Sequence, residues 1–135
     1  MIKHIMVRTS RQGLHEFSAQ LQQAVEESGM REGLCTIFLQ HTSASLTIQE
    51  NADACARRDL ENWLNRLVPE NDPLYTHNHE GADDMPAHIK SMLTQTSLSI
   101  PVSDGRLALG TWQGVYLWEH RHGGVARRVV LHISA

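Results

Sequence analysis

The fold is decided by the last third of the chain, which reads LSIPVSDGRLALGTWQGVYLWEHRHGGVARRVVLHIS over residues 98–134. Short apolar runs alternate there with turn residues, a pattern typical of successive strands. The Gly123-Gly124 pair predicts a hairpin turn between the last two strands. We expect four strands in this stretch, at residues 98–102, 106–109, 112–120 and 127–134.

Upstream of this stretch, the apolar residues recur mostly at helical spacing. We expect a first helix through Leu14, Phe17, Leu21 and Val25, ended by Gly29, and a second helix over residues 52–67. Asp83 or Asp84 is expected to cap a third helix, with Pro86 in its first turn. Two further strands are expected at 2–8 and at 34–41, the latter continued after a break by 46–48.

The order of these elements indicates the fold class. Helices lie mainly in the first two-thirds of the chain and strands dominate the end, which predicts an α+β fold with a largely antiparallel sheet. Neither an internal repeat nor a linker-like stretch divides the sequence. We therefore expect a single domain over residues 1–135.

The composition excludes several classes of protein. The 135 residues are enough to bury a substantial core. A net charge of −3 and a pI near 6.3 argue against nucleic-acid binding. The sequence shows neither an apolar run near the ~20 residues of a transmembrane helix nor the apolar region of a signal peptide. Cys35 and Cys55 form no CxxC motif and cannot make a disulfide framework, so we expect a cytoplasmic protein. From the charge and the lack of long apolar runs, we expect it to bind neither nucleic acid nor membranes.

The densest group of potential metal ligands is the segment HNHEGADDMPAH, residues 77–88. His79 lies in a loop and His88 about one turn inside the third helix, so both can converge on one divalent ion. Asp83 or Asp84 would be the third ligand or would orient a ligand. The alternative is that one aspartate only caps the helix and the histidines are solvated.

A second group of polar residues follows the strand at 34–41. His41 ends that strand, and the hydroxyls of Ser43 and Ser45 beside it are suitable donors to an anionic group. The alternative is that His41 is a satisfied core histidine.

The third group lies in the strand-rich end of the chain. Thr111 and Gln113 offer hydrogen bonds, and Trp112 offers a flat surface for a ring; a strand bend with a packed Trp is the alternative. Glu119 shares a strand face with apolar residues, where a carboxylate is costly to bury without a partner. It therefore either pairs with Arg121 at the strand end or faces a polar site.

Taken together, these segments resemble one known family over essentially the whole chain. The matching residues are 41–44 with 50–53, the motif His79-x-Gly81-x-Asp83-Asp84-Met85-Pro86-x-His88, residues 100–113, and Glu119-x-Arg121. These segments resemble the motifs of the YjbQ family, whose members are also called the secondary thiamine-phosphate synthase enzymes. The resemblance implies a compact α+β fold with a β-sandwich-like core, a homotrimer, a histidine-rich metal or anion site, and thiamine-phosphate synthase activity.

The resemblance and the chemistry of the side chains together assign expected roles. The expected metal ligands are His41, His79, Asp83 and His88; the expected catalytic residues are His41, Asp84 and Glu119; and the expected substrate contacts are Ser43, Ser45, Thr111, Trp112, Gln113 and Arg121. We expect zinc at the histidine site, and magnesium to accompany a diphosphate substrate.

The function expected from the sequence is that of a metal-dependent enzyme acting on phosphorylated small molecules. The synthase reaction joins a pyrimidine-methyl diphosphate to a thiazole phosphate and releases pyrophosphate, so charge on the leaving group must be stabilised. Two alternatives remain open. A metal-dependent hydrolase would need the same histidines, and a non-enzymatic trimeric module could bind a metal or a phosphorylated metabolite.

Overall fold

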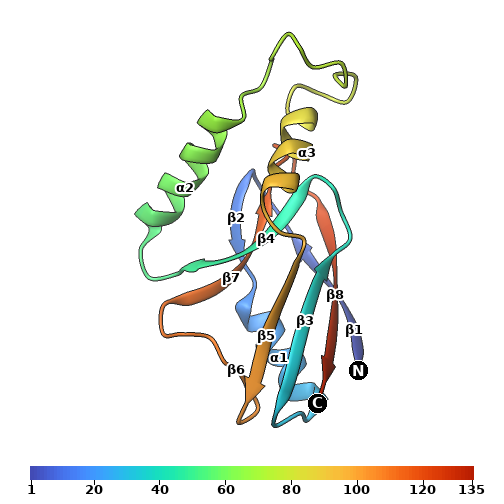
Figure 1. Cartoon of the computed structure of the whole chain (residues 1–135), viewed down its shortest axis with the longest axis vertical. Coiled ribbons are helices and arrows are strands. Elements are labelled where there is room, and N and C mark those ends of the chain that lie inside the picture. The colour runs from blue at the N-terminus through green and yellow to red at the C-terminus, as the bar shows by residue number, and fades with distance from the viewer.

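The larger of the two sheets consists of strands in which buried and exposed side chains alternate. In the computed structural model, which describes residues 1–135, this sheet has five antiparallel strands (Figure 1). Cys35, Ile37 and Leu39 of β3 are buried, while Leu34 and Phe38 on its other face are exposed. In spatial order, the strands are β1 (Ile2–Arg8), β8 (Ala126–Ser134), β3 (Gly33–Leu39), β5 (Ser97–Ser103) and β6 (Arg106–Leu107).

The smaller sheet is built around a strand that is buried on both faces. Its order is β2 (Gly13–Glu16), β7 (Gln113–Glu119) and β4 (Ala44–Glu50), all antiparallel. Val115 and Leu117 of β7 belong to the main core, and Tyr116 and Trp118 on the opposite face belong to a second apolar cluster. This double burial explains why β7 shows no polar alternation in the sequence.

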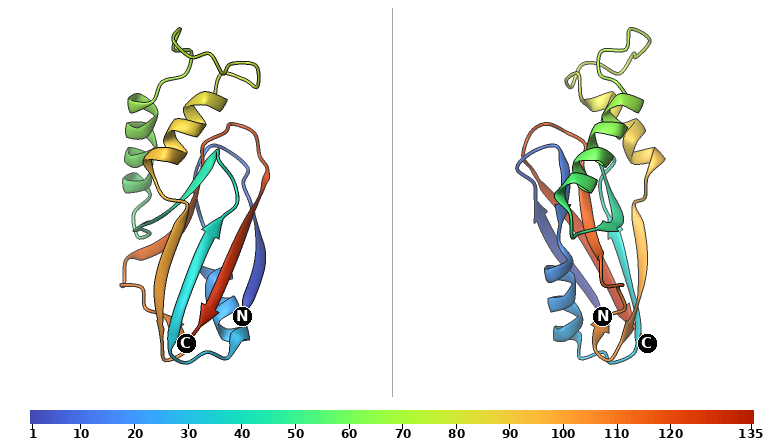
Figure 2. Two further views of the ribbon diagram at one scale, coloured as in Figure 1. Left: turned by 45° about the vertical axis from the view of Figure 1, so that its right-hand side comes forward. Right: turned by 90° about the vertical axis from the view of Figure 1, so that its left-hand side faces the viewer.

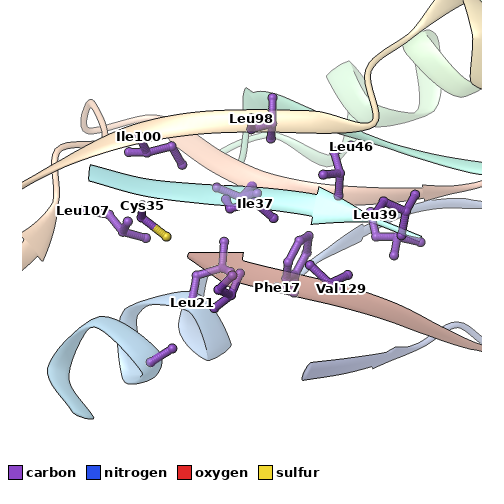
Figure 3. Packing of buried hydrophobic residues seen from close by; sticks show 14 of the residues in the cluster. Phe17, Leu21, Cys35, Ile37, Leu39, Leu46, Leu98, Ile100, Leu107 and Val129 are labelled. Carbon is purple, nitrogen blue, oxygen red and sulfur yellow. The ribbon is translucent and has the colours of Figure 1, made fainter. Parts of the chain in front are cut away.

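The main core is aliphatic and lies between the two sheets, with helix α1 (Ser18–Ser28) closing one side (Figure 3). Leu21 and Val25 of α1 have no exposed surface, and Phe17 just before the helix is 3% exposed. The helix ends where Gly29 adopts a left-handed conformation at φ 70°, which favours glycine.

Helices α2 (Ala54–Leu67) and α3 (Asp84–Leu93) lie together at one end of the sheets (Figure 2). Leu64 of α2 packs with Tyr116 and Trp118 on the outer face of the smaller sheet. Helix α3 packs beside β4, where Ser91 Oγ donates to Ala44 O over 3.0 Å. None of the helices has the length and apolar character needed to cross a membrane.

The predicted α+β class, with antiparallel sheets and about three helices, is confirmed, but three details of the prediction are wrong. Leu14 lies in β2 and not in the first helix. Strand β4 does not continue β3, because the two strands belong to different sheets. Strands β7 and β8 also lie in different sheets, so Gly123-Gly124 joins the two layers and makes no hairpin. A side chain at Gly124 would collide with Thr9 O.

Candidate metal centre

Three potential ligand atoms converge at the start of α3, all within 4.8 Å of one another. They belong to His77, Asp84 and His88, which we call the ligand cluster. Asp84 and His88 are four residues apart on α3 and therefore share a face. Asp84 Oδ2 lies 2.7 Å from His77 Nε2 and 3.3 Å from His88 Nε2. His77 comes from the loop between α2 and α3, which folds back over the helix end (Figure 1).

The remaining polar atoms of the α3 ligands are held by protein groups. His88 Nδ1 lies 3.0 Å from Thr42 O, and Asp84 Oδ1 accepts from Arg121 Nη1 over 2.7 Å. Burial raises the pKa of Asp84, but the hydrogen bond to His77 and the charges of His88 and Arg121 outweigh burial and lower this pKa below its usual value. Asp84 is therefore an ionised carboxylate that presents one oxygen to both histidines.

Asp83 occupies the N-cap position of α3 and holds the neighbouring segment instead of joining the ligand cluster. Its Oδ2 accepts from Arg121 Nε over 3.0 Å and from the backbone N–H of His122 over 2.8 Å. Gly81 has a φ of 111°, and a Cβ there would lie 3.0 Å from Asp83 Oδ1. The glycine thus allows the loop to approach this carboxylate closely.

Glu119, at the end of β7 and two residues before Arg121, is fully buried. Oε1 accepts from Thr9 Oγ1 and Arg127 Nε, each over 2.8 Å, while Oε2 accepts from Arg127 Nη2 and from Arg121 N. Burial raises the pKa of Glu119, but the hydrogen bonds from Arg127 and Thr9 outweigh burial and lower it. Because Arg127 is on β8, this ion pair also joins the two sheets.

The structure places three of the four expected ligands outside the ligand cluster: Asp83, described above, and also His41 and His79. His41 Nε2 accepts from the backbone N–H of Arg128 over 2.8 Å. His79 is a neighbour of the cluster, with its ring centroid 4.9 Å from that of His77, but its side chain is 70% exposed. Of the four residues expected to bind metal, only His88 belongs to the cluster, together with Asp84 and the unselected His77.

The two expected serine contacts have different surroundings. Ser45 is buried, and its Oγ lies 2.9 Å from Nε2 of the equally buried His120. Ser43 is half-buried and follows Thr42, whose carbonyl contacts His88. Ser43 is therefore the serine better placed to meet a molecule bound at the cluster.

The expected contacts Thr111, Trp112 and Gln113 lie at the far end of β7 from the ligand cluster. The seven residues of β7 separate the two ends by roughly 20 Å. Gln113 Oε1 accepts from Gly110 N over 2.8 Å, and Trp112 is 63% exposed. These residues cannot reach the cluster of their own chain.

A cavity of about 290 Å³ opens beside the ligand cluster. His77 contributes to its wall together with side chains of the same loop, including Asn71, Tyr75 and Asn78, and with Met85 of α3. The space is large enough to receive part of a small molecule next to the convergent ligand atoms.

Comparison with known proteins shows the family to which the chain belongs. The family model described as UPF0047 protein YjbQ-like matches residues 3–135. The chain belongs to the YjbQ family. A UPF0047 protein of Synechocystis is 52% identical over 130 residues, covering 96% of this chain and 88% of the relative. The YjbQ protein of Escherichia coli O157:H7 is 50% identical over 110 residues, covering 82% of this chain and 79% of the relative.

Two solved structures share the fold of this chain. The crystal structure of a YjbQ/UPF0047 protein from Clostridium acetobutylicum superposes with a TM-score of 0.89 at 34% identity, covering 98% of this chain and 99% of the other. A conserved hypothetical protein from Thermus thermophilus gives a TM-score of 0.88 at 33% identity, with the same coverage. The two-sheet arrangement with its end helices is thus shared with these two proteins.

Proposed function

We propose that this YjbQ-family protein is a metal-dependent enzyme acting on phosphorylated small molecules, with a divalent ion, preferentially zinc, held by the ligand cluster. The observation that carries this proposal is the convergence of His77 Nε2, Asp84 Oδ2 and His88 Nε2. Two imidazoles and one carboxylate form a ligand set typical of catalytic zinc, which keeps a further position open for water or substrate.

One distance between the ligand atoms already suits such an ion. Two ligand atoms bound to zinc at about 2.0–2.1 Å in tetrahedral geometry lie roughly 3.3 Å apart. His88 Nε2 and Asp84 Oδ2 have this spacing, at 3.3 Å, whereas His77 Nε2 and Asp84 Oδ2 lie at a hydrogen-bond distance of 2.7 Å that an ion between them would lengthen. Thr42 O and Arg121 engage the other polar atoms of these two residues, and such contacts orient the ligands in metal sites. The residues present fit a divalent metal.

A divalent ion at the cluster would stabilise negative charge on a phosphoryl or diphosphate group. Other side chains would hold the ligand residues in position. Arg121 orients Asp84 and is itself held by Asp83. Glu119 fixes the backbone at Arg121, so we assign Glu119 a positioning role in place of the catalytic role expected from the sequence.

Within this class of reaction, we propose thiamine-phosphate synthesis, which the resemblance to the family implies. The pyrimidine-methyl diphosphate would bind at the ligand cluster, with magnesium accompanying the diphosphate and Ser43 offering a hydroxyl to a phosphate oxygen. The cavity beside His77 offers room for one of the two rings.

We also propose that the enzyme is a homotrimer whose sites are shared between chains. Trp112 and its neighbours are exposed and lie at the opposite end of β7 from the cluster of their own chain, with a strand length of about 20 Å between the two ends. A contribution of these residues to the site therefore requires a second copy of the chain. Three-fold packing, which the resemblance implies, would place the Trp112 segment of one chain beside the cluster of its neighbour.

A synthase assay tests the proposed activity. Formation of thiamine phosphate from the two precursors should fall about 10²–10³-fold in Asp84→Asn and in His88→Ala, the loss typical when a charge-stabilising group is removed. Asp104→Asn, at an exposed carboxylate in the β5–β6 turn, is the matched control and should keep the wild-type rate. Release of phosphate without thiamine phosphate would favour the hydrolase, and binding without turnover would favour the non-enzymatic module.

A further inference from the structure

Figure 1 shows that the start of α2 lies away from the loop between α2 and α3, which carries His77. A second, separate group of charged side chains lies at this start of the helix. A cavity of about 360 Å³ lies there, and three of its five lining residues are arginines: Arg11, Arg57 and Arg58. Helix α2 has 14 residues and is therefore about 21 Å long, so this cavity is distinct from the ligand cluster.

Two of these arginines are held in place by the surrounding structure. Arg57 Nη1 donates to Tyr116 Oη over 3.4 Å, and its guanidinium carbon lies 6.0 Å from the centre of the Tyr116 ring. Arg11 Nη1 donates to Gln12 O over 2.7 Å. Arg58 forms no ion pair or hydrogen bond, so all of its donors are available. The guanidinium groups are thus partly preorganised around the cavity.

The charges in the cavity wall are not balanced. Glu61 is its only carboxylate, and Oε2 of Glu61 is engaged by Leu14 N over 2.7 Å and by Arg11 Nη1 over 3.5 Å. A Cβ at Gly13 would collide with both Arg11 and Glu61, so this glycine leaves room for the pair. Asp53 interacts electrostatically with Arg57 and Arg58, but neither Asp53 nor Asp59 lines the cavity. The cavity wall itself therefore has three guanidinium groups against one engaged carboxylate, an excess of positive charge.

We infer that this cavity, which we call the arginine pocket, binds a phosphoryl anion such as a phosphate or diphosphate group. A guanidinium presents a planar fork of N–H donors that matches phosphate oxygens in pairs, which makes arginine the preferred residue for such recognition. The volume suits a small phosphorylated group. The inference does not depend on the proposed enzymatic function, because none of the ligand cluster lines this pocket.

Calorimetric titration with inorganic pyrophosphate tests the pocket, in a low-salt buffer with a chelator that removes any metal. Wild-type protein should bind one pyrophosphate per chain. Arg57→Gln and Arg58→Gln should each weaken binding by about 10-fold to 100-fold, as expected for the loss of charged hydrogen bonds. Arg58 is exposed, so its replacement leaves the fold intact. His88→Ala should bind pyrophosphate like the wild type, whatever the outcome of the synthase assay.

Arg31→Gln is the matched control, because it removes one positive charge from an exposed side chain outside the pocket and should change the affinity less than twofold. Three results would overturn the inference. They are no saturable binding to the wild type, equal weakening by Arg31→Gln and Arg58→Gln, and loss of binding in His88→Ala but not in Arg58→Gln.

Discussion

Arg121 donates through Nη1 to Oδ1 of Asp84 over 2.7 Å, which leaves Oδ2 of Asp84 facing His77 and His88. The arginine thereby decides which carboxylate oxygen points into the ligand cluster. Asp83 Oδ2 accepts from Nε of the same guanidinium, so the two consecutive aspartates have different tasks. One offers an oxygen to the cluster and the other fixes the arginine that orients it.

The first prediction concerns this contact. Arg121→Gln should weaken the affinity for zinc about 10-fold to 100-fold without abolishing binding, because groups that orient metal ligands typically contribute this much. Competition with a chromophoric chelator measures the affinity. Arg128→Gln is the control, since that exposed side chain forms no hydrogen bond. Equal zinc affinity of Arg121→Gln and the wild type would show that Arg121 does not orient Asp84.

The second prediction concerns the buried Glu119–Arg127 ion pair. Glu119→Gln should lower the free energy of unfolding by about 3–5 kcal/mol, because it leaves the Arg127 charge buried without a partner. The double variant Glu119→Leu/Arg127→Met should recover much of this loss, since both charges are then removed. Urea denaturation measures both. Wild-type stability of Glu119→Gln combined with loss of synthase activity would instead favour the catalytic role of Glu119.

The third prediction concerns pH. Burial, with smaller contributions from the charges of Lys90 and Arg127, lowers the pKa of His120 from 6.5 to about 3. Between these values the unfolded chain binds a proton that the folded chain does not. The stability contributed by neutral His120 is therefore present above pH 6.5 and is lost as the pH falls. From pH 7.5 to 5.5 this loss is about 1.4 kcal/mol.

Urea denaturation of the wild type and of His120→Gln at pH 7.5 and 5.5 isolates this effect. The glutamine keeps a polar group beside Ser45 but does not titrate. On acidification, the free energy of unfolding of the variant should therefore fall by about 1.4 kcal/mol less than that of the wild type. Replacement of the exposed His4 by Gln is the control. The same pH dependence in His120→Gln as in the wild type would refute the assignment.

Local pattern predicts most of the secondary structure but not the assignment of strands to sheets. The end of α2 at Leu67 and the alternation in β3 follow from local spacing, whereas α2 begins at Ala54, two residues later than expected, after its N-cap Asp53. Leu14 continues the helical spacing of the residues after it, and yet it pairs with β7 in the smaller sheet. Whether Gly123-Gly124 closes a hairpin or joins two sheets depends on the strands with which β7 and β8 pair. These partner strands are far away in the sequence, and the residues of the turn carry no information about them.

The same limit applies to the ligand cluster. The sequence correctly draws attention to residues 77–88, because imidazoles and carboxylates gather there. The sequence does not identify His77 as a ligand, because the backbone path of the loop determines which of its histidines points toward the cluster. The difference between Asp83 and Asp84 depends on Arg121, whose guanidinium reaches both from the end of β7.

The fourth prediction concerns assembly. Light scattering should report about three times the chain mass of 15.2 kDa, and a monomer at micromolar concentration would contradict the proposed homotrimer. His88→Ala and Trp112→Ala should each be inactive alone. Coexpressed, they should recover about a quarter of wild-type activity, because half of the clusters are intact and half of the neighbouring Trp112 segments are intact. No recovery in verified mixed trimers would show that the site is not shared.

The most direct test of the ligand cluster is the metal content of four purified proteins, measured by elemental analysis: the wild type, His77→Ala, His79→Ala and His88→Ala. The ligand cluster predicts about one divalent ion per chain in the wild type and in His79→Ala, whose side chain is largely exposed, and little in His77→Ala and His88→Ala. Circular dichroism confirms that each variant is folded. Equal metal content in all four proteins, or loss in His79→Ala with retention in His77→Ala, would contradict the assignment of His77, Asp84 and His88 as the metal site.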